Sequence, residues 1–225
     1  MKVRSHVGRW PALLLVPTVV ALALVTVAVA EAPKVHLTAD GQAAARAVVL
    51  RKADLAPATG WTGGLSKSDL SDSGPLCPNF EPKQSDLVVN GAAESQWTHP
   101  SGLTFFSQGE VLQTAQMVRL DWQRSVLSPK MLPCVSRTLV EGAGPGAQLI
   151  SATRLKFPQI ATYATQFRVV IGASGSSARA MIDTIFIGNG RTEITLMASG
   201  PFTAKNALGA AEIRLARILV SRIRA

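Results

Sequence analysis

The alternation of hydrophobic and polar positions is most regular in the last third of the chain. Four runs rich in Val, Ile, Thr and Phe follow one another there, separated by short connections that contain Pro, Gly, Ser or Asn. Asn189-Gly190, with apolar residues on both sides, is typical of a tight β-hairpin turn. Short connections imply antiparallel neighbours. We therefore predict a four-stranded meander with strands at 148–157, 160–171, 178–187 and 191–199.

A further hairpin is predicted in the middle of the chain. The segments 95–99 and 103–113 are rich in strand-forming residues, and Pro100-Ser101-Gly102 between them has the composition of a turn. These two strands bring the expected total to about six.

Apolar residues recur at helical spacing in three other segments. Thr38 or Asp40, Thr114 and Thr203 precede them and can cap their N-termini. In the last of the three, the apolar residues form one continuous stripe. The predicted helices cover 38–52, 115–127 and 204–224.

The order of these elements indicates an α+β fold. Helix, two strands, helix, four strands and helix follow one another, which is typical of a curved antiparallel sheet with helices packed on it. Beyond residue 30 the chain is long enough for one domain with a hydrophobic core. We expect a single domain at 31–225, preceded by an apolar N-terminal helix.

The first 30 residues have the composition of an export segment. Three basic residues precede an uncharged apolar run at 12–30. Ala28-Val29-Ala30 before Glu31 is a small-x-small site, which predicts signal-peptide cleavage between Ala30 and Glu31. The run has the length of a short membrane span, which instead favours a retained anchor. Both alternatives place the rest of the chain outside the cytoplasm, secreted or anchored by one helix.

An irregular segment at 62–95 contains one of the two cysteines, Cys77. So long a stretch rich in Gly, Ser, Asp and Pro is uncommon inside a domain unless it is functional or tied down. Cys134 follows the second predicted helix. Because an even pair of cysteines in an exported chain indicates a disulfide, we predict a Cys77–Cys134 bridge.

The chain is basic, with 23 Lys and Arg residues against 14 Asp and Glu residues. Three of the cations precede the apolar run, so the excess in the remainder is modest and spread along the sequence. Outside the membrane this charge can meet anionic lipid or wall polymers, and nucleic acid is not an expected partner. A solvated basic surface is the simpler interpretation.

Together these features resemble a known group, the exported sensor-type domains of actinobacteria that include the extracellular domain of PknH-type receptor kinases. The resemblance rests on the export segment, the helix exit at 50–57, Cys77 in a loop, Cys134 after a helix, and the closing strand and helix; it covers roughly 40–222. It implies a Mog1/PsbP-like α+β fold and binding of a ligand or partner. Receptor-type members carry more cysteines than this pair. The 225 residues contain no kinase sequence, so we expect any signalling to act through partners.

No catalytic, metal or cofactor site is predicted. The three histidines lack Cys, Asp or Glu partners at metal-ligand spacing, and neither a G-x-S-x-G nor a G-x-G-x-x-G sequence occurs. Asp183, an acid in an apolar strand, is expected to pair with Arg168 or Arg179. The best candidate binding surface consists of aromatic residues in and around the irregular segment, namely Trp61, Phe80 and Trp97.

Three hypotheses follow for the function. The first is an extracytoplasmic, non-enzymatic sensor-like domain that binds an unknown ligand or envelope protein. The second is a structural envelope protein that contacts anionic surfaces through its basic C-terminal helix. The third is an exported hydrolase with dispersed residues, which requires Asp183 or His99 in a pocket beside Ser95 or Ser107. In the first two, an uncleaved N-terminal segment would also hold the chain at the membrane.

Overall fold

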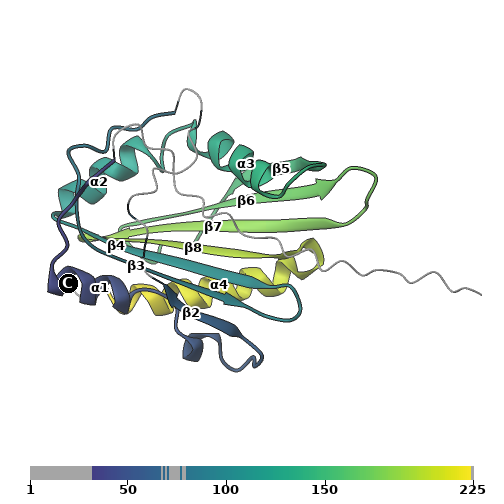
Figure 1. Cartoon of the computed structure of the whole chain (residues 1–225), viewed down its shortest axis with the longest axis horizontal. Helices are drawn as coiled ribbons and strands as arrows, with labels where there is room; N and C mark the ends of the chain where they lie inside the picture. Colours follow the sequence, from purple (N-terminus) through teal and green to yellow (C-terminus); the bar gives the residue numbers. More distant parts are fainter. Residues whose placement is uncertain (1–31, 67, 69, 71–76, 78–79, 224–225) are drawn as a thin grey trace, which may run out of the picture.

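The computed structural model describes residues 32–66, 68, 70, 77 and 80–223. The predicted signal or anchor segment at 1–30 lies outside these residues. Within them, one open eight-stranded sheet runs in the order β1-β3-β4-β8-β7-β6-β5, and β2 also pairs with β3. Helices cover both faces of the sheet, with α2 and α3 above it and α1 and α4 below it in Figure 1. The α+β prediction is confirmed.

The meander in the last third of the chain is confirmed. Strands β5, β6, β7 and β8 are consecutive antiparallel neighbours. Gly190 in the predicted Asn-Gly turn has φ of 57°, a left-handed conformation that glycine adopts without steric cost. The four strands are Ala147–Leu155, Tyr163–Ala173, Arg179–Asn189 and Thr192–Pro201.

The other side of the sheet is larger than predicted. Strand β3 (Val88–Thr98) begins seven residues before the predicted start and pairs with β4 (Thr104–Leu112). Two short strands lie along its outer edge: β1 (Lys34–Val35) runs parallel to it, and β2 (Thr62–Ser66) runs antiparallel. The sheet is therefore mixed, and the prediction of six antiparallel strands was wrong on both counts. β1 and β2 are short and carry little apolar pattern, so no periodicity identified them.

Three predicted helices are present, with shorter bounds. Helix α1 (Ala39–Ala47) is followed by a 3₁₀ turn, η1 (Lys52–Leu55), and α2 covers Ala115–Arg124. The Thr38 and Thr114 hydroxyls cap α1 and α2, accepting from backbone N–H groups at 3.0 and 3.2 Å. Helix α4 (Lys205–Val220) follows the 3₁₀ turn η2 (Phe202–Ala204). Thr203 lies inside that turn and the N-cap is Ala204, so the predicted Thr203 cap was wrong.

Helix α3 (Met131–Gly142) was not predicted, because Pro129 and Pro133 are residues that usually end a helix. Pro133 is the third residue of α3. The first N–H groups of a helix have no intrahelical partner, so a proline costs little at this position. Met131, Val135 and Leu139 repeat every four residues and are buried against the sheet, a pattern present in the sequence.

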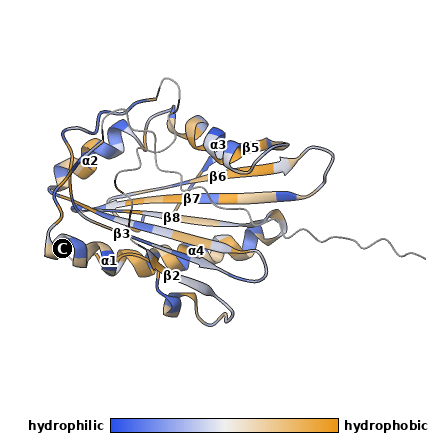
Figure 2. Cartoon of the chain, viewed as in Figure 1, coloured by the Kyte–Doolittle hydropathy of each residue, from blue (hydrophilic) through white to orange (hydrophobic). Residues whose placement is uncertain are grey.

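Two hydrophobic cores lie on opposite faces of the sheet. The core under α2 and α3 includes Trp122 and Phe167, and the core over α4 includes Ile185 and Leu215. Figure 2 shows hydrophobic residues along the central strands and on the helices beside them. In the described part of the chain, no helix is long and apolar enough to span a membrane.

Two glycines allow α1 to approach β3 unusually closely. A Cβ atom at Gly41 would lie 2.2 Å from the Asn90 carbonyl oxygen, and one at Gly91 would lie 2.1 Å from the Gly41 backbone. Real Cβ atoms do not approach backbone this closely, so any side chain at either position must displace the helix.

The C-terminal helix is attached to η1 through Asp54. The guanidinium of Arg222 donates to both carboxylate oxygens of Asp54, and Arg214 Nη1 donates to the Asp54 backbone oxygen at 2.7 Å. Asp54 is 7% exposed. Arg214 of α4 and Arg222, which follows the end of this helix, are therefore engaged within the fold. Contact of this helix with anionic surfaces stays a prediction that rests on its other cations.

We expect Asp54→Asn to lower the free energy of unfolding by about 2–3 kcal/mol, since hydrogen bonds to a charged group are lost in a largely buried position. Urea denaturation measures the change. Asp40→Asn, at an exposed position in the first turn of α1, is the control and should cost under about 1 kcal/mol. Equal losses in the two variants would contradict the role of the Asp54–Arg222 pair.

Candidate functional site

The three aromatic residues of the predicted binding surface are not brought together. Trp61 and Trp97 lie in the core over α4, and Phe80 lies in the core under α2. The Trp61 ring is 5.1 Å from the His99 ring, between centroids, and Trp97 Nε1 donates to the Leu50 oxygen at 3.3 Å. Ligand binding by any of the three stays a prediction, but they form no common surface.

The residues that would have indicated a hydrolase do not form a catalytic group. Ser95 and Ser107 are fully buried and hydrogen-bonded to each other at 2.9 Å, and the Leu50 N–H donates to the Ser107 oxygen at 2.8 Å. His99 instead lies in the turn between β3 and β4, where it forms hydrogen bonds with the Ser101 hydroxyl and the Thr59 carbonyl. This arrangement pairs neither serine with His99.

The predicted Cys77–Cys134 disulfide is present, with 5.5 Å between the two Cα atoms. It attaches the irregular segment to α3. The Phe80 N–H donates to the Cys77 oxygen at 3.0 Å, and these two residues form an isolated β-bridge. Phe80 then packs into the core under α2. The disulfide and this aromatic anchor together hold residues 80–82 against the helices.

An open pocket of about 530 Å³ lies where this segment meets the α2–α3 connection. It has apolar and charged walls, formed by Phe80, Glu81, Pro82, Arg124, Ser128 and Lys130. We call it the α2–α3 pocket. Phe80 is the one residue of the predicted aromatic surface that lines it.

Arg124 sets the shape of this pocket. Its guanidinium makes two hydrogen bonds to the Asp86 carboxylate, at 2.6 and 3.0 Å, and a third to the Lys83 oxygen at 3.0 Å. These bonds clamp the irregular segment onto α2. The guanidinium also holds the pKa of the Asp86 carboxyl below its ordinary value.

Four carboxyl groups lie beneath α2, on the same face of the sheet. Glu110 and Glu193 are direct cross-strand neighbours in β4 and β8, and Glu94 comes from β3. Asp121 of α2 accepts hydrogen bonds from Gln84 and, at 2.8 Å, from Ser125. In the described residues no group of His, Cys, Asp and Glu side chains could hold a metal ion. The four are called the acidic cluster.

Burial raises the pKa of three members of the acidic cluster. The pKa of Glu110 rises to about 7, with Asp121 and Glu94 adding to the shift. The pKa values of Glu193 and Asp121 are also raised by burial, and that of Glu193 lies well above its ordinary value. Like charges opposite each other on neighbouring strands are unfavourable, so protons are retained here near neutral pH.

A second polar network lies on the opposite face of the sheet, between the sheet and α4. The predicted pairing of Asp183 with Arg168 is confirmed: Arg168 Nε donates to Asp183 Oδ1 at 2.8 Å. Gln166 Nε2 bridges the Asp183 and Glu212 carboxyls at 3.1 and 2.9 Å. One arginine thus faces two buried acids. We call these four residues the α4 network.

Glu212 was missed as a site residue. It is 1% exposed, and one of its oxygens, Oε1, has no hydrogen-bond partner. Burial raises its pKa to about 8, and the neighbouring Asp183 charge adds to this. The signal was available, because Glu212 falls four residues after Leu208 and three before Leu215, within the apolar stripe of α4.

Comparison with known proteins found one kind of similarity. No known protein family matches the chain, and no curated protein matches it. Among solved structures, it is similar to the extracellular domain of PknH from Mycobacterium tuberculosis, with a TM-score of 0.49 and 9% sequence identity. The match covers 80% of this chain and 96% of that one. Actinobacterial origin and the Mog1/PsbP-like class stay predictions.

Proposed function

We propose that this chain is an extracytoplasmic, non-enzymatic sensor-like domain that binds a small polar ligand in the α2–α3 pocket. The apolar run at 12–30 and the Cys77–Cys134 disulfide support a location outside the cytoplasm, because disulfides persist in oxidising compartments. The observation that carries the proposal is the pocket itself, whose irregular wall is held in place by that disulfide and by the Arg124 clamp.

The pocket wall indicates the kind of ligand. Lys130 supplies a cationic group, the Arg124 guanidinium is shared with Asp86, Glu81 is a carboxylate in the wall, and Ser128 adds a hydroxyl. Phe80 and Pro82 give an apolar side. A few placed polar groups next to an apolar wall are typical of small-molecule sites. The ligand proposed is a small molecule with an anionic group and a ring or short chain, such as a fragment of an anionic wall glycan.

Substitution of Lys130 tests this site without disturbing the Arg124 clamp. In a screen of anionic glycan fragments by NMR titration, we expect Lys130→Glu to weaken binding at least about tenfold, because an ionic hydrogen bond is replaced by repulsion. Arg119→Glu makes the same change of charge at an exposed position of α2 outside the pocket, and should leave affinity within about twofold. Fragments that bind both variants equally, or bind neither variant nor the wild type, would contradict the proposal.

A further inference from the structure

We propose that the end of the sheet formed by β1 and the β7–β8 turn is a membrane-facing surface that rests on the anionic headgroups of the bilayer from which the chain emerges. This inference rests on the proposed extracytoplasmic location and on the alternative in which the apolar run at 12–30 is retained as an anchor. It names the surface of the domain that meets the membrane, and it therefore fixes which surfaces remain free for a ligand.

The length of chain before β1 carries the first step. The apolar run ends at Ala30, and β1 begins at Lys34. Four residues span at most about 14 Å when fully extended. The Lys34 N–H donates to the Leu87 oxygen at 2.9 Å, and the His36 N–H donates to the Val89 oxygen at the same distance, so the segment is bonded to the sheet from its first residue. A retained anchor would thus hold this end of the sheet within reach of the headgroup layer.

The exposed side chains at this end carry the second step. Val35 and Leu37 are 48% and 46% exposed, and they are separated by one residue in an extended segment. Four other large apolar side chains of the described chain are as exposed, namely Leu65, Leu127, Leu149 and Ile150, but none of them directly follows the apolar run in the sequence. Apolar residues next to a span are suited to the bilayer interface, where they regain an apolar environment without leaving the sheet.

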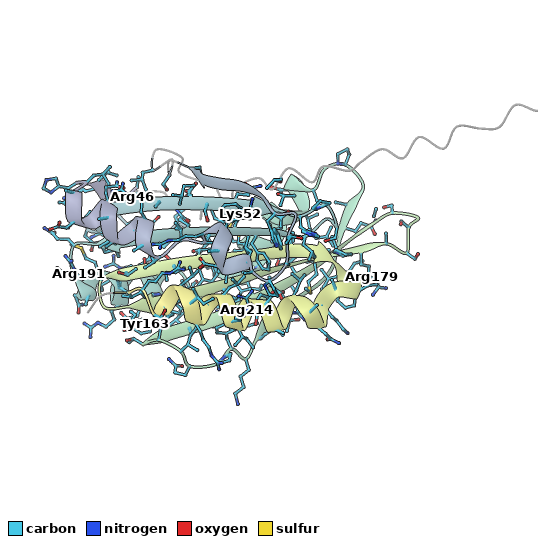
Figure 3. All side chains as sticks on the ribbon, turned by 90° about the horizontal axis from the view of Figure 1, so that it is seen from below. Arg46, Lys52, Tyr163, Arg179, Arg191 and Arg214 are labelled. Atoms are coloured by element: carbon cyan, nitrogen blue, oxygen red, sulfur yellow. A yellow bond between two sulfur atoms is a disulfide. The ribbon has the colours of Figure 1, made fainter. Side chains whose placement is uncertain are left out.

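The charges around the apolar pair carry the third step. Val88, which pairs with Lys34 of β1, accepts a hydrogen bond from the Gln113 N–H. The neighbouring Leu112 N–H donates to the Arg191 oxygen, so Arg191 lies at the same end of the sheet as β1. Figure 3 shows Arg191 and Arg46 toward one end of the molecule and Arg179 at the opposite end. Lys34, Arg46 and Arg191 are exposed cations, and Asp40 in the first turn of α1 is an exposed acid. Exposed cations close to an anionic membrane surface are attracted to it.

The test uses the full chain reconstituted in vesicles of phosphatidylcholine with anionic phosphatidylglycerol. An environment-sensitive dye is attached to Leu37→Cys or, as the matched control at the opposite end, to Ser176→Cys. Shallow spin-labelled lipids should quench the dye at position 37 at least about threefold more than at 176, since only position 37 lies on the surface proposed to face the headgroup layer. Lys34→Glu with Arg191→Glu should reduce that quenching, more so at low ionic strength.

Equal quenching at positions 37 and 176 would overturn the proposal. So would recovery of the exported protein with Glu31 as its first residue, because no anchor would then hold β1 at the bilayer. Ligand titration of the α2–α3 pocket in the same vesicles separates the two ideas. If only the membrane-facing surface were wrong, the wild type would still bind fragments in the α2–α3 pocket. Lys130→Glu would still weaken that binding.

Discussion

Raising the pH from about 4.5 to above 8 should remove about 4–5 kcal/mol of stability through the ionisation of Glu212 beside Asp183. The pKa of this carboxyl is raised from 4.5 to about 8 in the folded chain, chiefly by burial. Each pKa unit corresponds to about 1.4 kcal/mol. A raised pKa means that the folded state holds a proton that the unfolded state releases. The contribution is therefore fully present below pH 4.5 and is lost as the pH rises through 8.

The geometry of the α4 network explains the size of this effect. Arg168 already neutralises Asp183, so a second negative charge on Glu212 has no cation in this network to balance it. Glu212 Oε2 accepts one hydrogen bond from Gln166, whereas Oε1 has no donor. A proton on Glu212 removes its charge, and its loss adds a second buried negative charge beside Asp183.

Denaturant unfolding of the wild type and of Glu212→Gln between pH 4.5 and 9 measures how much the free energy of unfolding depends on the ionisation of Glu212. The amide keeps the shape of the protonated acid, so the two stabilities should converge near pH 4.5. The variant should be the more stable protein at pH 9, by about 4–5 kcal/mol. Taking the difference between the proteins removes the contributions of Glu110 and Glu193 beneath α2. Glu141→Gln, at an exposed position of α3, is the matched control. Parallel curves for wild type and Glu212→Gln would show that Glu212 holds no extra proton.

Removing the disulfide should cost roughly 4 kcal/mol. Cys77 and Cys134 are 57 residues apart, and cross-linking so long a loop restricts the unfolded chain considerably. We expect Cys77→Ser with Cys134→Ser to lower the free energy of unfolding by that amount in urea denaturation. Reduction of the wild type should produce the same change. Because the disulfide anchors the segment that lines the α2–α3 pocket, fragment binding there should weaken as well.

Two results would contradict this account of the disulfide. One is a pair of free thiols in protein recovered from outside the cell, measured by mass before and after alkylation. The other is a double-serine variant that unfolds at the wild-type urea concentration and binds fragments normally. If the double-serine variant were less stable but still bound fragments normally, Phe80 and Arg124 would be sufficient to hold the pocket without the disulfide.

The sequence predicted elements wherever apolar periodicity ran for many residues. The four strands of the meander, the Asn189-Gly190 turn and the caps Thr38 and Thr114 all follow from local rules, because a β-strand or a helix start depends on neighbouring residues. Helix α3 could have been recognised from its four-residue repeat if Pro133 had been placed in a first turn. Strands β1 and β2 could not, since they exist only because β3 has a free edge.

The candidate site was predicted in part. The Cys77–Cys134 bridge and the Asp183–Arg168 pair follow from residue types, because a paired cysteine and a buried acid each require a partner. The α2–α3 pocket does not follow, because residues 80–82 and 124–130 meet only through the disulfide and the Arg124–Asp86 clamp. Trp61 and Phe80 are 19 positions apart, and no sequence rule indicates that they lie on opposite faces of one sheet.

By itself, the sequence determined the α+β class, the meander and the disulfide, because each is encoded in local composition or in a unique pairing; the export segment stays a prediction. The tertiary structure alone decided which acids are buried together and where the pocket opens. Glu110 meets Glu193 because β4 pairs with β8 across 83 positions of chain, and Glu212 meets Asp183 because α4 packs back over β7. Such contacts depend on strand order and helix docking, which are set by the burial of the whole apolar surface.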